Sequence, residues 1–140
     1  MKSKKITQEL IGYIHFFEKI TRVHVKDCFL YEEEVIFIVD GKMLGKAVGK
    51  QGVNAKRLAQ NLRKRVKIVA FDDDVTKFVQ NLIYPVKSSN IYKGEDNIIT
   101  IKASDYQSRA LIIGRDSKNL KVCKEIVSCY FEIQDIKVSS

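Results

Sequence analysis

The 140-residue chain contains an internal repeat, and this repeat restricts the possible folds more than any other feature. When Gly49 is placed on Gly114, an offset of 65 residues, Asn54 falls on Asn119. The helical and β-prone patterns follow in the same order in both halves. A repeated order of elements indicates one supersecondary unit that occurs twice. We therefore expect two small α+β units in tandem.

The first half alternates between helical and β-prone patterns. Thr7 precedes a run of apolar residues at helical spacing and is a suitable N-cap. Three consecutive glutamates, Glu32 to Glu34, separate two β-prone runs, which indicates an antiparallel pair joined by a tight turn. A short helix and a glycine-rich turn follow. The predicted elements are a helix over 7–21, strands over 25–31 and 35–39, a helix over 54–65 and a strand over 66–71.

The second half begins with three aspartates, Asp72 to Asp74, which suit the start of a helix through capping and the helix dipole. Pro85 is the only proline and ends that helix. We place a domain boundary at residue 72, at the start of the acidic run, with one domain over 1–72 and the other over 73–140. The predicted elements are a linking helix over about 74–83, strands over 86–92 and 97–101, helices over 106–113 and 118–130, and a strand over 133–138.

The positive charge of the chain is concentrated in one part of the sequence. Residues 1–71 hold 15 Lys and Arg against 7 Asp and Glu, a balance of +8, whereas residues 72–140 hold 10 of each. Within the first half, residues 41–71 carry nine basic side chains and no acidic one. A concentrated basic field points to a polyanion as partner. A merely solvated basic face is the alternative.

The segment GKMLGKAVGKQGVNAKRL, residues 41–58, has three competing interpretations. A Walker A phosphate loop fails on spacing, because only three residues separate Gly45 from Gly49. It also fails on chemistry, because Gln51 stands where a magnesium-binding hydroxyl is needed. A purely structural turn, in which the glycines only permit positive φ, stays open. The third interpretation is a G-x-x-G loop between two helices, from Gly49 to Gly52.

A G-x-x-G loop in this setting suits a single-stranded nucleic acid. Glycines let backbone amides approach a sugar–phosphate chain, and the start of the next helix adds unpaired N–H donors. Modules of this kind take about four unstacked nucleotides in an apolar groove beside the loop. The candidate RNA-binding residues of the first half are Lys46, Gly49, Lys50, Gln51, Gly52, Asn54, Lys56 and Arg57.

The stretch AVGKQGVNAKRLAQNL resembles the KH-domain signature, and more narrowly the KH repeats of the transcription elongation and termination factor NusA. The linker DDDVTKFVQNLIYPV also resembles the segment that joins two KH units in that family. The resemblance covers nearly the whole chain. It implies two tandem prokaryotic-type (type II) KH domains, each a three-stranded sheet with helices on one face. It also implies RNA binding during transcription and no catalysis. The positions that match the pattern are Gly49, Gly52, Asn54, Arg57, Leu58, Ala59 and Leu62.

Bacterial members of that family carry a polymerase-binding domain and an S1 domain in addition. A chain of 140 residues has no room for either, so we expect the short two-KH form typical of archaea.

The second loop, Gly114 to Ser117, departs from the family pattern. Ser117 replaces the closing glycine, and its Cβ obstructs close approach of the backbone to a ligand. Asp116 places a negative charge where a phosphate would lie. Gly114, Arg115 and Lys118 are the candidate RNA-binding residues there. We therefore expect the first unit to grip the RNA and the second to extend or orient it through weaker contacts.

Other classes of protein are disfavoured. No run of about 18 apolar residues is present, and the basic N-terminus lacks the apolar segment and cleavage site of an export signal. The three cysteines form no C-x-x-C pair, which fits reduced thiols, and Cys123 is expected in the core. His15 and His24 have no ligand partners at metal spacing, so neither a metal nor a cofactor is expected.

The sequence thus predicts a cytoplasmic RNA-binding transcription factor of the NusA type rather than an enzyme. Its expected partner is single-stranded RNA, with RNA polymerase as a second candidate and with no membrane or small-molecule substrate. Two alternatives stay open. One is a protein-interaction adaptor that docks on RNA polymerase and uses its glycines only as turn residues. The other is a KH protein of ribosomal RNA processing.

Overall fold

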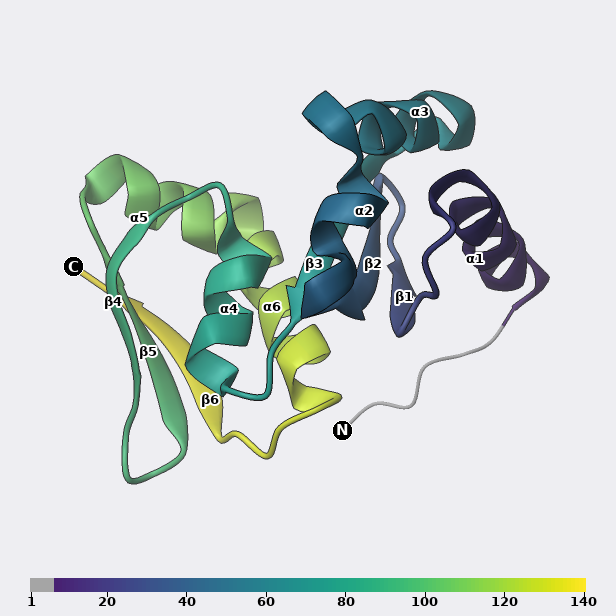
Figure 1. Cartoon of the computed structure of the whole chain (residues 1–140). Coiled ribbons are helices and arrows are strands. Elements are labelled where there is room, and N and C mark those ends of the chain that lie inside the picture. Colours follow the sequence, from purple (N-terminus) through teal and green to yellow (C-terminus); the bar gives the residue numbers. More distant parts are fainter. Residues whose placement is uncertain (1–6) are drawn as a thin grey trace. The chain divides into compact units, whose positions relative to one another are not determined.

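The computed structural model of the chain describes residues 7–140. The chain divides into two compact units, one ending at Asp72 and the other beginning at Asp73. Each unit contains a three-stranded sheet and its own helices (Figure 1). The α+β class and the two three-stranded sheets expected from the sequence are therefore confirmed.

The first unit runs through a helix, two strands, two helices and a third strand. Its first helix begins where Thr7 Oγ1 accepts a hydrogen bond from the N–H of Leu10 at 3.1 Å, which confirms Thr7 as the N-cap. Short 3₁₀ turns lie before and after its second helix. The elements are α1 (Gln8–Thr21), β1 (Asp27–Leu30), β2 (Glu34–Asp40), α2 (Leu44–Val48), α3 (Val53–Leu62) and β3 (Arg65–Phe71).

β2 is the central strand of the first sheet. It pairs antiparallel with β1, where Phe37 lies opposite Cys28, and parallel with β3, where Phe37 lies opposite Ile68. Parallel strands need a crossover connection, which here consists of α2, the G-x-x-G loop and α3. The loop is therefore held between two helices that both belong to the crossover.

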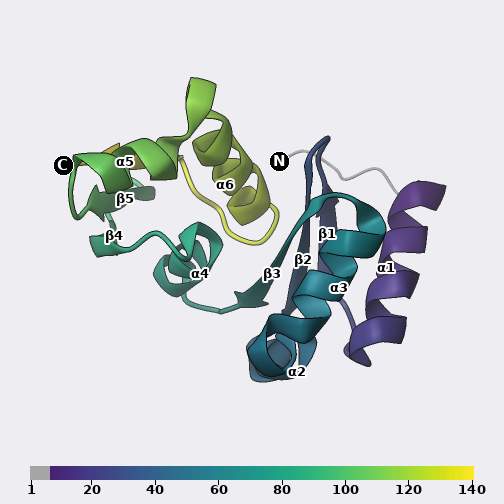
Figure 2. The same cartoon turned by 90° about the horizontal axis from the view of Figure 1, so that it is seen from above.

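The helices of the first unit cover one face of its sheet (Figure 2). Side chains alternate along a strand, so Val35, Phe37 and Val39 of β2 share that face, and all three are fully buried. The ring of Phe37 stacks on Phe17 of α1, with the centroids 4.3 Å apart. Leu58 of α3 is buried in the same cluster. Burying such a side chain stabilises the fold by about 1.5–3 kcal/mol, so α3 and the loop at its start are firmly anchored.

The second unit begins with a capped helix, as the acidic run predicted. Oδ1 of Asp74 accepts hydrogen bonds from the hydroxyl of Thr76 at 2.7 Å and from its N–H at 2.9 Å. These bonds lower the pKa of Asp74. The elements are α4 (Val75–Ile83), β4 (Ser88–Lys93), β5 (Ile98–Ala103), α5 (Tyr106–Ile113), α6 (Lys118–Ser128) and β6 (Asp135–Ser139).

The second sheet has the topology of the first. β5 is central, antiparallel to β4 and parallel to β6, and α5, the second loop and α6 form the crossover. Cys123 of α6 is buried, as predicted from its place on the apolar stripe of that helix. Tyr130 lies just beyond α6 and is half-buried, with its ring edge-on to Phe78 at 5.7 Å. Burial raises the pKa of Tyr130.

Several predicted ends of elements are wrong by two or three residues. The helix predicted over 54–65 ends at Leu62, because Arg63 adopts the left-handed conformation (φ 55°, ψ 36°) and Arg65 already pairs with Glu34 in the sheet. Arg and Lys are good helix formers, so the local pattern does not mark this end, and pairing with β2 decides it. The helix predicted over 118–130 ends at Ser128, and the strands predicted from 25, 86 and 133 begin at Asp27, Ser88 and Asp135.

Candidate nucleic-acid interface

The first G-x-x-G loop joins α2 to α3 through three residues with positive φ. Gly49 lies at φ 81°, ψ 165°, Gln51 at φ 57°, ψ 25°, and Gly52 at φ 74°, ψ 20°. The conformation of Gly49 is essentially restricted to glycine, whereas the other two residues lie in the left-handed helical region. The loop therefore turns sharply and starts α3 directly after Gly52.

The second loop has the same backbone conformation although its sequence differs. Gly114 lies at φ 77°, ψ 170°, Asp116 at φ 55°, ψ 29°, and Ser117 at φ 60°, ψ 21°. The largest difference from the first loop is 14°, between the φ of Ser117 (60°) and that of Gly52 (74°). A left-handed conformation costs a residue other than glycine about 1–2 kcal/mol. The second unit therefore keeps the loop geometry at some cost in stability.

An asparagine holds each loop in place. In the first loop, Nδ2 of Asn54 donates a hydrogen bond to the carbonyl oxygen of Lys46 at 3.2 Å. In the second, Nδ2 of Asn119 donates to the carbonyl oxygen of Leu111 at 2.9 Å. Each bond ties the first turn of one helix to the last turn of the helix before it, where carbonyl groups lack helical partners. The sequence predicted Asn54 as an RNA contact. In the structure, its amide nitrogen bonds the carbonyl oxygen of Lys46 and so holds the loop.

The two glycines of the first loop differ in how strongly the turn requires them. A Cβ on Gly49 would lie 3.0 Å from side-chain atoms of both Asn54 and Val53. A Cβ on Gly52 would meet nothing closer than Cε of Lys56 at 4.0 Å. The turn itself thus has room for a side chain at position 52, as Ser117 demonstrates at the equivalent position. A glycine at 52 leaves the outer surface of the loop open.

The loop also presents backbone donors. Its hydrogen bonds use the N–H groups of Gly49, Gly52 and Val53. Within residues 7–140, the N–H groups of Lys50 and Gln51 take part in no hydrogen bond. Donors at the start of a helix, next to its positive dipole end, are suited to binding an anion.

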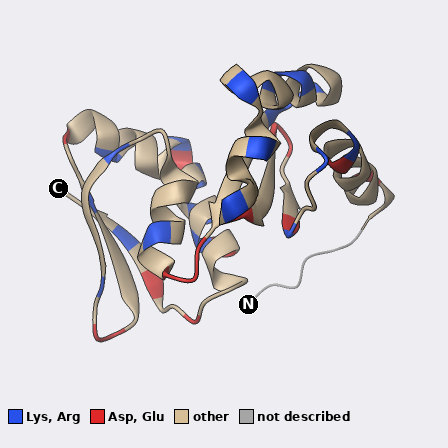
Figure 3. Ribbon diagram, viewed as in Figure 1, with Lys and Arg blue, Asp and Glu red and all other residues tan. Residues whose placement is uncertain are grey.

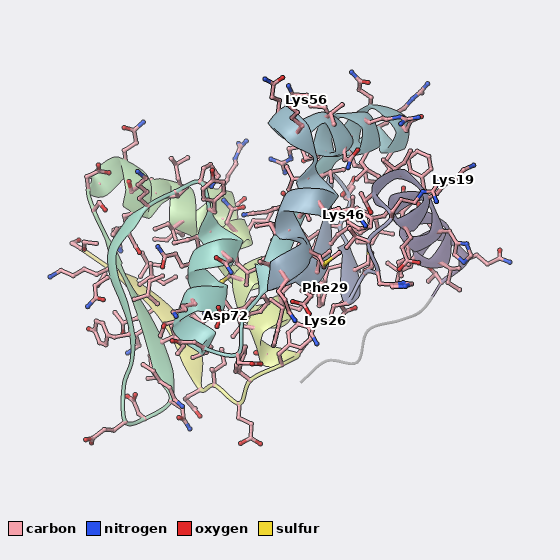
Figure 4. The ribbon with its side chains drawn as sticks, in the orientation of Figure 1. Lys19, Lys26, Phe29, Lys46, Lys56 and Asp72 are labelled. Atoms are coloured by element: carbon pink, nitrogen blue, oxygen red, sulfur yellow. The ribbon has the colours of Figure 1, made fainter. Side chains whose placement is uncertain are left out.

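Exposed basic side chains lie in the loop and on the helices that flank it. Lys46, Lys50, Lys56 and Arg57 are all exposed, and none of the four forms an ion pair with another described residue. Figure 3 shows α2 and α3 with basic positions and no acidic ones. Lys56 extends from the start of α3 into solvent (Figure 4). All eight residues predicted for the first loop lie on α2, in the loop or in the first half of α3.

The second loop has a different chemical character. Arg115 and Lys118 are exposed as predicted, but so is Asp116 between them. Leu111, which is 54% exposed, stands at the position equivalent to Lys46. The two loops therefore share one backbone shape and differ in charge. Asn119 was not among the predicted site residues, although its alignment with Asn54 in the repeat was a signal for it.

The cysteines and histidines, which the sequence analysis weighed as disulfide or metal-binding residues, lie as follows. Cys28 and Cys123 are buried, Cys129 is half-buried, and the three are thiols rather than members of a disulfide. His15 and His24 are exposed. Within residues 7–140, no group of three or more His, Cys, Asp and Glu side chains is arranged to hold a metal ion. In the same range, every helix is too short or too polar to cross a membrane.

Proteins of known sequence and structure resemble this chain over nearly its whole length. It is 36% identical over 141 residues to the "Probable transcription termination protein NusA" of Methanocaldococcus jannaschii, a match that covers 99% of this chain and 76% of the relative. The protein of the same name from Methanococcus vannielii is 28% identical over 137 residues, which cover 96% and 79%. The crystal structure of APE1850 matches with a TM-score of 0.71 and 28% identity, covering 95% of this chain and 99% of that one. No protein-family model matches the sequence.

Proposed function

Since the chain belongs to the NusA family of probable archaeal transcription termination proteins, we propose that it is a transcription factor that binds single-stranded RNA through its first G-x-x-G loop. The observation that carries this proposal is the loop from Gly49 to Gly52. It combines two backbone N–H groups without intramolecular partners, an unobstructed glycine, and exposed basic side chains in the loop and on the two helices that flank it.

Both units are, on this proposal, KH domains of the prokaryotic type. Three features support this: the order of elements, the central strand with one antiparallel and one parallel neighbour, and a G-x-x-G-like loop inside the crossover. The domains then correspond to residues 1–72 and 73–140, the second one starting with the linking helix α4.

The RNA phosphates would lie against the N–H groups of Lys50 and Gln51, with Lys46, Lys56 and Arg57 as counter-charges. Unstacked bases would lie beside the loop, as in other modules that bind about four nucleotides. Each phosphate neutralised on a single strand changes the slope of log affinity against log salt by about −0.7. Four such contacts would give a slope of about −2.8.

The second loop would contribute less to affinity than the first. Gly114, Arg115 and Lys118 keep the geometry and some positive charge. Asp116 repels phosphate, and Ser117 carries a Cβ that Gly52 lacks. The second unit would then extend or orient the RNA. No step of this function requires turnover of a substrate, and RNA polymerase is the second partner that the family suggests.

Matched charge reversals in the two loops test this division of labour. Lys50→Glu should weaken the binding of a labelled single-stranded RNA by about tenfold, or about 1.4 kcal/mol. Arg115→Glu, at the equivalent position, should weaken it by only about threefold, because Asp116 already weakens that loop. Fluorescence anisotropy at two salt concentrations gives both affinities and the salt slope. An equal or larger loss for Arg115→Glu would contradict the proposed roles of the two units.

A further inference from the structure

The exposed face of α3 carries a row of polar and basic side chains that leads away from the loop. Lys56, Gln60 and Arg63 follow one another at i, i+4 and i+7, a spacing that places them on one face of a helix. All three are exposed. We call them the α3 stripe. Lys56 and Arg63 are seven positions apart, so at a rise of about 1.5 Å per residue the stripe runs for about 10 Å toward the far end of the helix.

Arg63 ends this stripe in an unusual backbone conformation. It lies at φ 55°, ψ 36°, and its N–H donates to the carbonyl oxygen of Ala59 at 2.9 Å. Glycine is the usual residue where a helix ends in this left-handed conformation, with asparagine next. Arg22 adopts the same conformation at the end of α1, so the conformation alone does not assign a role to the Arg63 side chain. A basic residue at the end of a helix also interacts favourably with the helix dipole. What distinguishes Arg63 is its place at the end of the α3 stripe.

The side chain of the neighbouring Lys64 forms a hydrogen bond to a described residue of the unit, whereas that of Arg63 does not. Nζ of Lys64 donates to the carbonyl oxygen of Tyr31 at 2.9 Å and lies 5.9 Å from the ring centroid of Tyr13. Within residues 7–140, the guanidinium of Arg63 forms neither a hydrogen bond nor an ion pair. The Arg63 side chain is therefore available to a ligand.

The α3 stripe has no counterpart on α6, the equivalent helix of the second unit. At an offset of 65 residues, Glu125 stands in place of Gln60 and Ser128 in place of Arg63 on α6. α6 also ends without a left-handed residue, since Cys129 lies at φ −71°, ψ −22°. Of the two helices that follow a loop of this shape, α3 carries the acid-free row with an arginine at its end, and α6 does not.

We propose that single-stranded RNA bound at the first loop continues along the α3 stripe and that Arg63 binds a phosphate at its far end. The first unit then holds a longer segment than the loop alone can take. This inference rests on the proposed RNA-binding function, and it adds a second contact region with its own length requirement. The loop and the groove beside it take up about four nucleotides, so a four-nucleotide RNA has none left for Arg63, whereas an RNA of about twelve has.

The test compares Arg63→Gly with Arg22→Gly on short and long RNAs. Arg22 is the matched control, because it is an exposed arginine in the same left-handed conformation (φ 61°, ψ 29°) at the end of α1. Arg63→Gly should lower the affinity for the long RNA about threefold to tenfold and flatten its salt slope by about 0.7. It should leave the affinity for the short RNA unchanged and should not lower the melting temperature. Arg22→Gly should change neither affinity.

A second variant, Gln60→Glu, places an acidic side chain at an exposed position in the middle of the stripe. It should likewise lower the affinity for the long RNA and leave that for the short RNA unchanged. If the wild type binds the short RNA, and both stripe variants bind the long RNA as tightly as the wild type does, this inference is overturned. An equal loss in Arg22→Gly would also overturn it, because net charge would then explain the effect. Failure of the wild type to bind the short RNA would instead refute the proposed function.

Discussion

Replacement of Lys50 and Gln51 together by aspartate should abolish RNA binding and leave the fold intact. The change replaces one basic and one neutral side chain by two acidic ones, beside the two N–H groups that we propose to bind a phosphate. The loss should be large, because hydrogen bonds to a charged group are stronger than those between neutral groups. The affinity should fall by about a hundredfold or more, equal to about 2.7 kcal/mol or more. Aspartate suits the left-handed conformation of Gln51, because Asp116 adopts it in the second loop at φ 55°. Fluorescence anisotropy with labelled RNA measures the loss, and circular dichroism verifies the fold.

This double variant also separates RNA binding from the adaptor alternative. An adaptor that docks on RNA polymerase would keep its interaction with polymerase after nuclease treatment and after the charge reversal. If the folded variant binds RNA as tightly as the wild type, the glycines are turn residues only. The loop would then have no part in RNA binding.

Replacement of Gly49 by alanine should destabilise the first unit by about 3 kcal/mol. The backbone of Gly49 lies in a region that costs other residues about 1–3 kcal/mol. The new Cβ would also press on Asn54, whose side chain cannot move without losing its hydrogen bond to the carbonyl of Lys46. Urea unfolding followed by circular dichroism measures the change in the free energy of unfolding.

Gly52→Ala is the matched control for that experiment. It should cost about 1 kcal/mol of stability, because only the left-handed conformation opposes it and the space is open. Its main effect should be on RNA affinity, since the new Cβ stands on the outer surface of the loop. A loss of stability at position 52 as large as that at position 49 would mean that both glycines serve the turn.

Much of the fold follows from local patterns in the sequence. Thr7 and Asp74 marked the starts of two helices because a side-chain oxygen that caps a helix is a local feature. Cys123 was expected in the core from its place on the apolar stripe of its helix, and it is buried. The repeat predicted that both units share one topology, which the two sheets confirm.

Other features depend on tertiary structure and were not predictable from local patterns. The end of α3 is set by the pairing of Arg65 with Glu34, which helix propensity cannot reveal. The sequence did not show that Ser117 adopts the left-handed conformation of Gly52, so that the second loop keeps the backbone of the first. The bonds from Asn54 and Asn119 to the preceding helices became apparent only with coordinates, because they join residues eight positions apart across a turn.

The most direct test of the central claim is a titration of the ¹⁵N-labelled full chain with a four-nucleotide single-stranded RNA, followed by NMR. We predict that the amide resonances of Lys50, Gln51 and Gly52 shift most, and that those of Arg115 and Asp116 shift less. Binding that moves resonances elsewhere and leaves residues 49–53 unchanged would contradict the account, because the loop would then not contact the RNA.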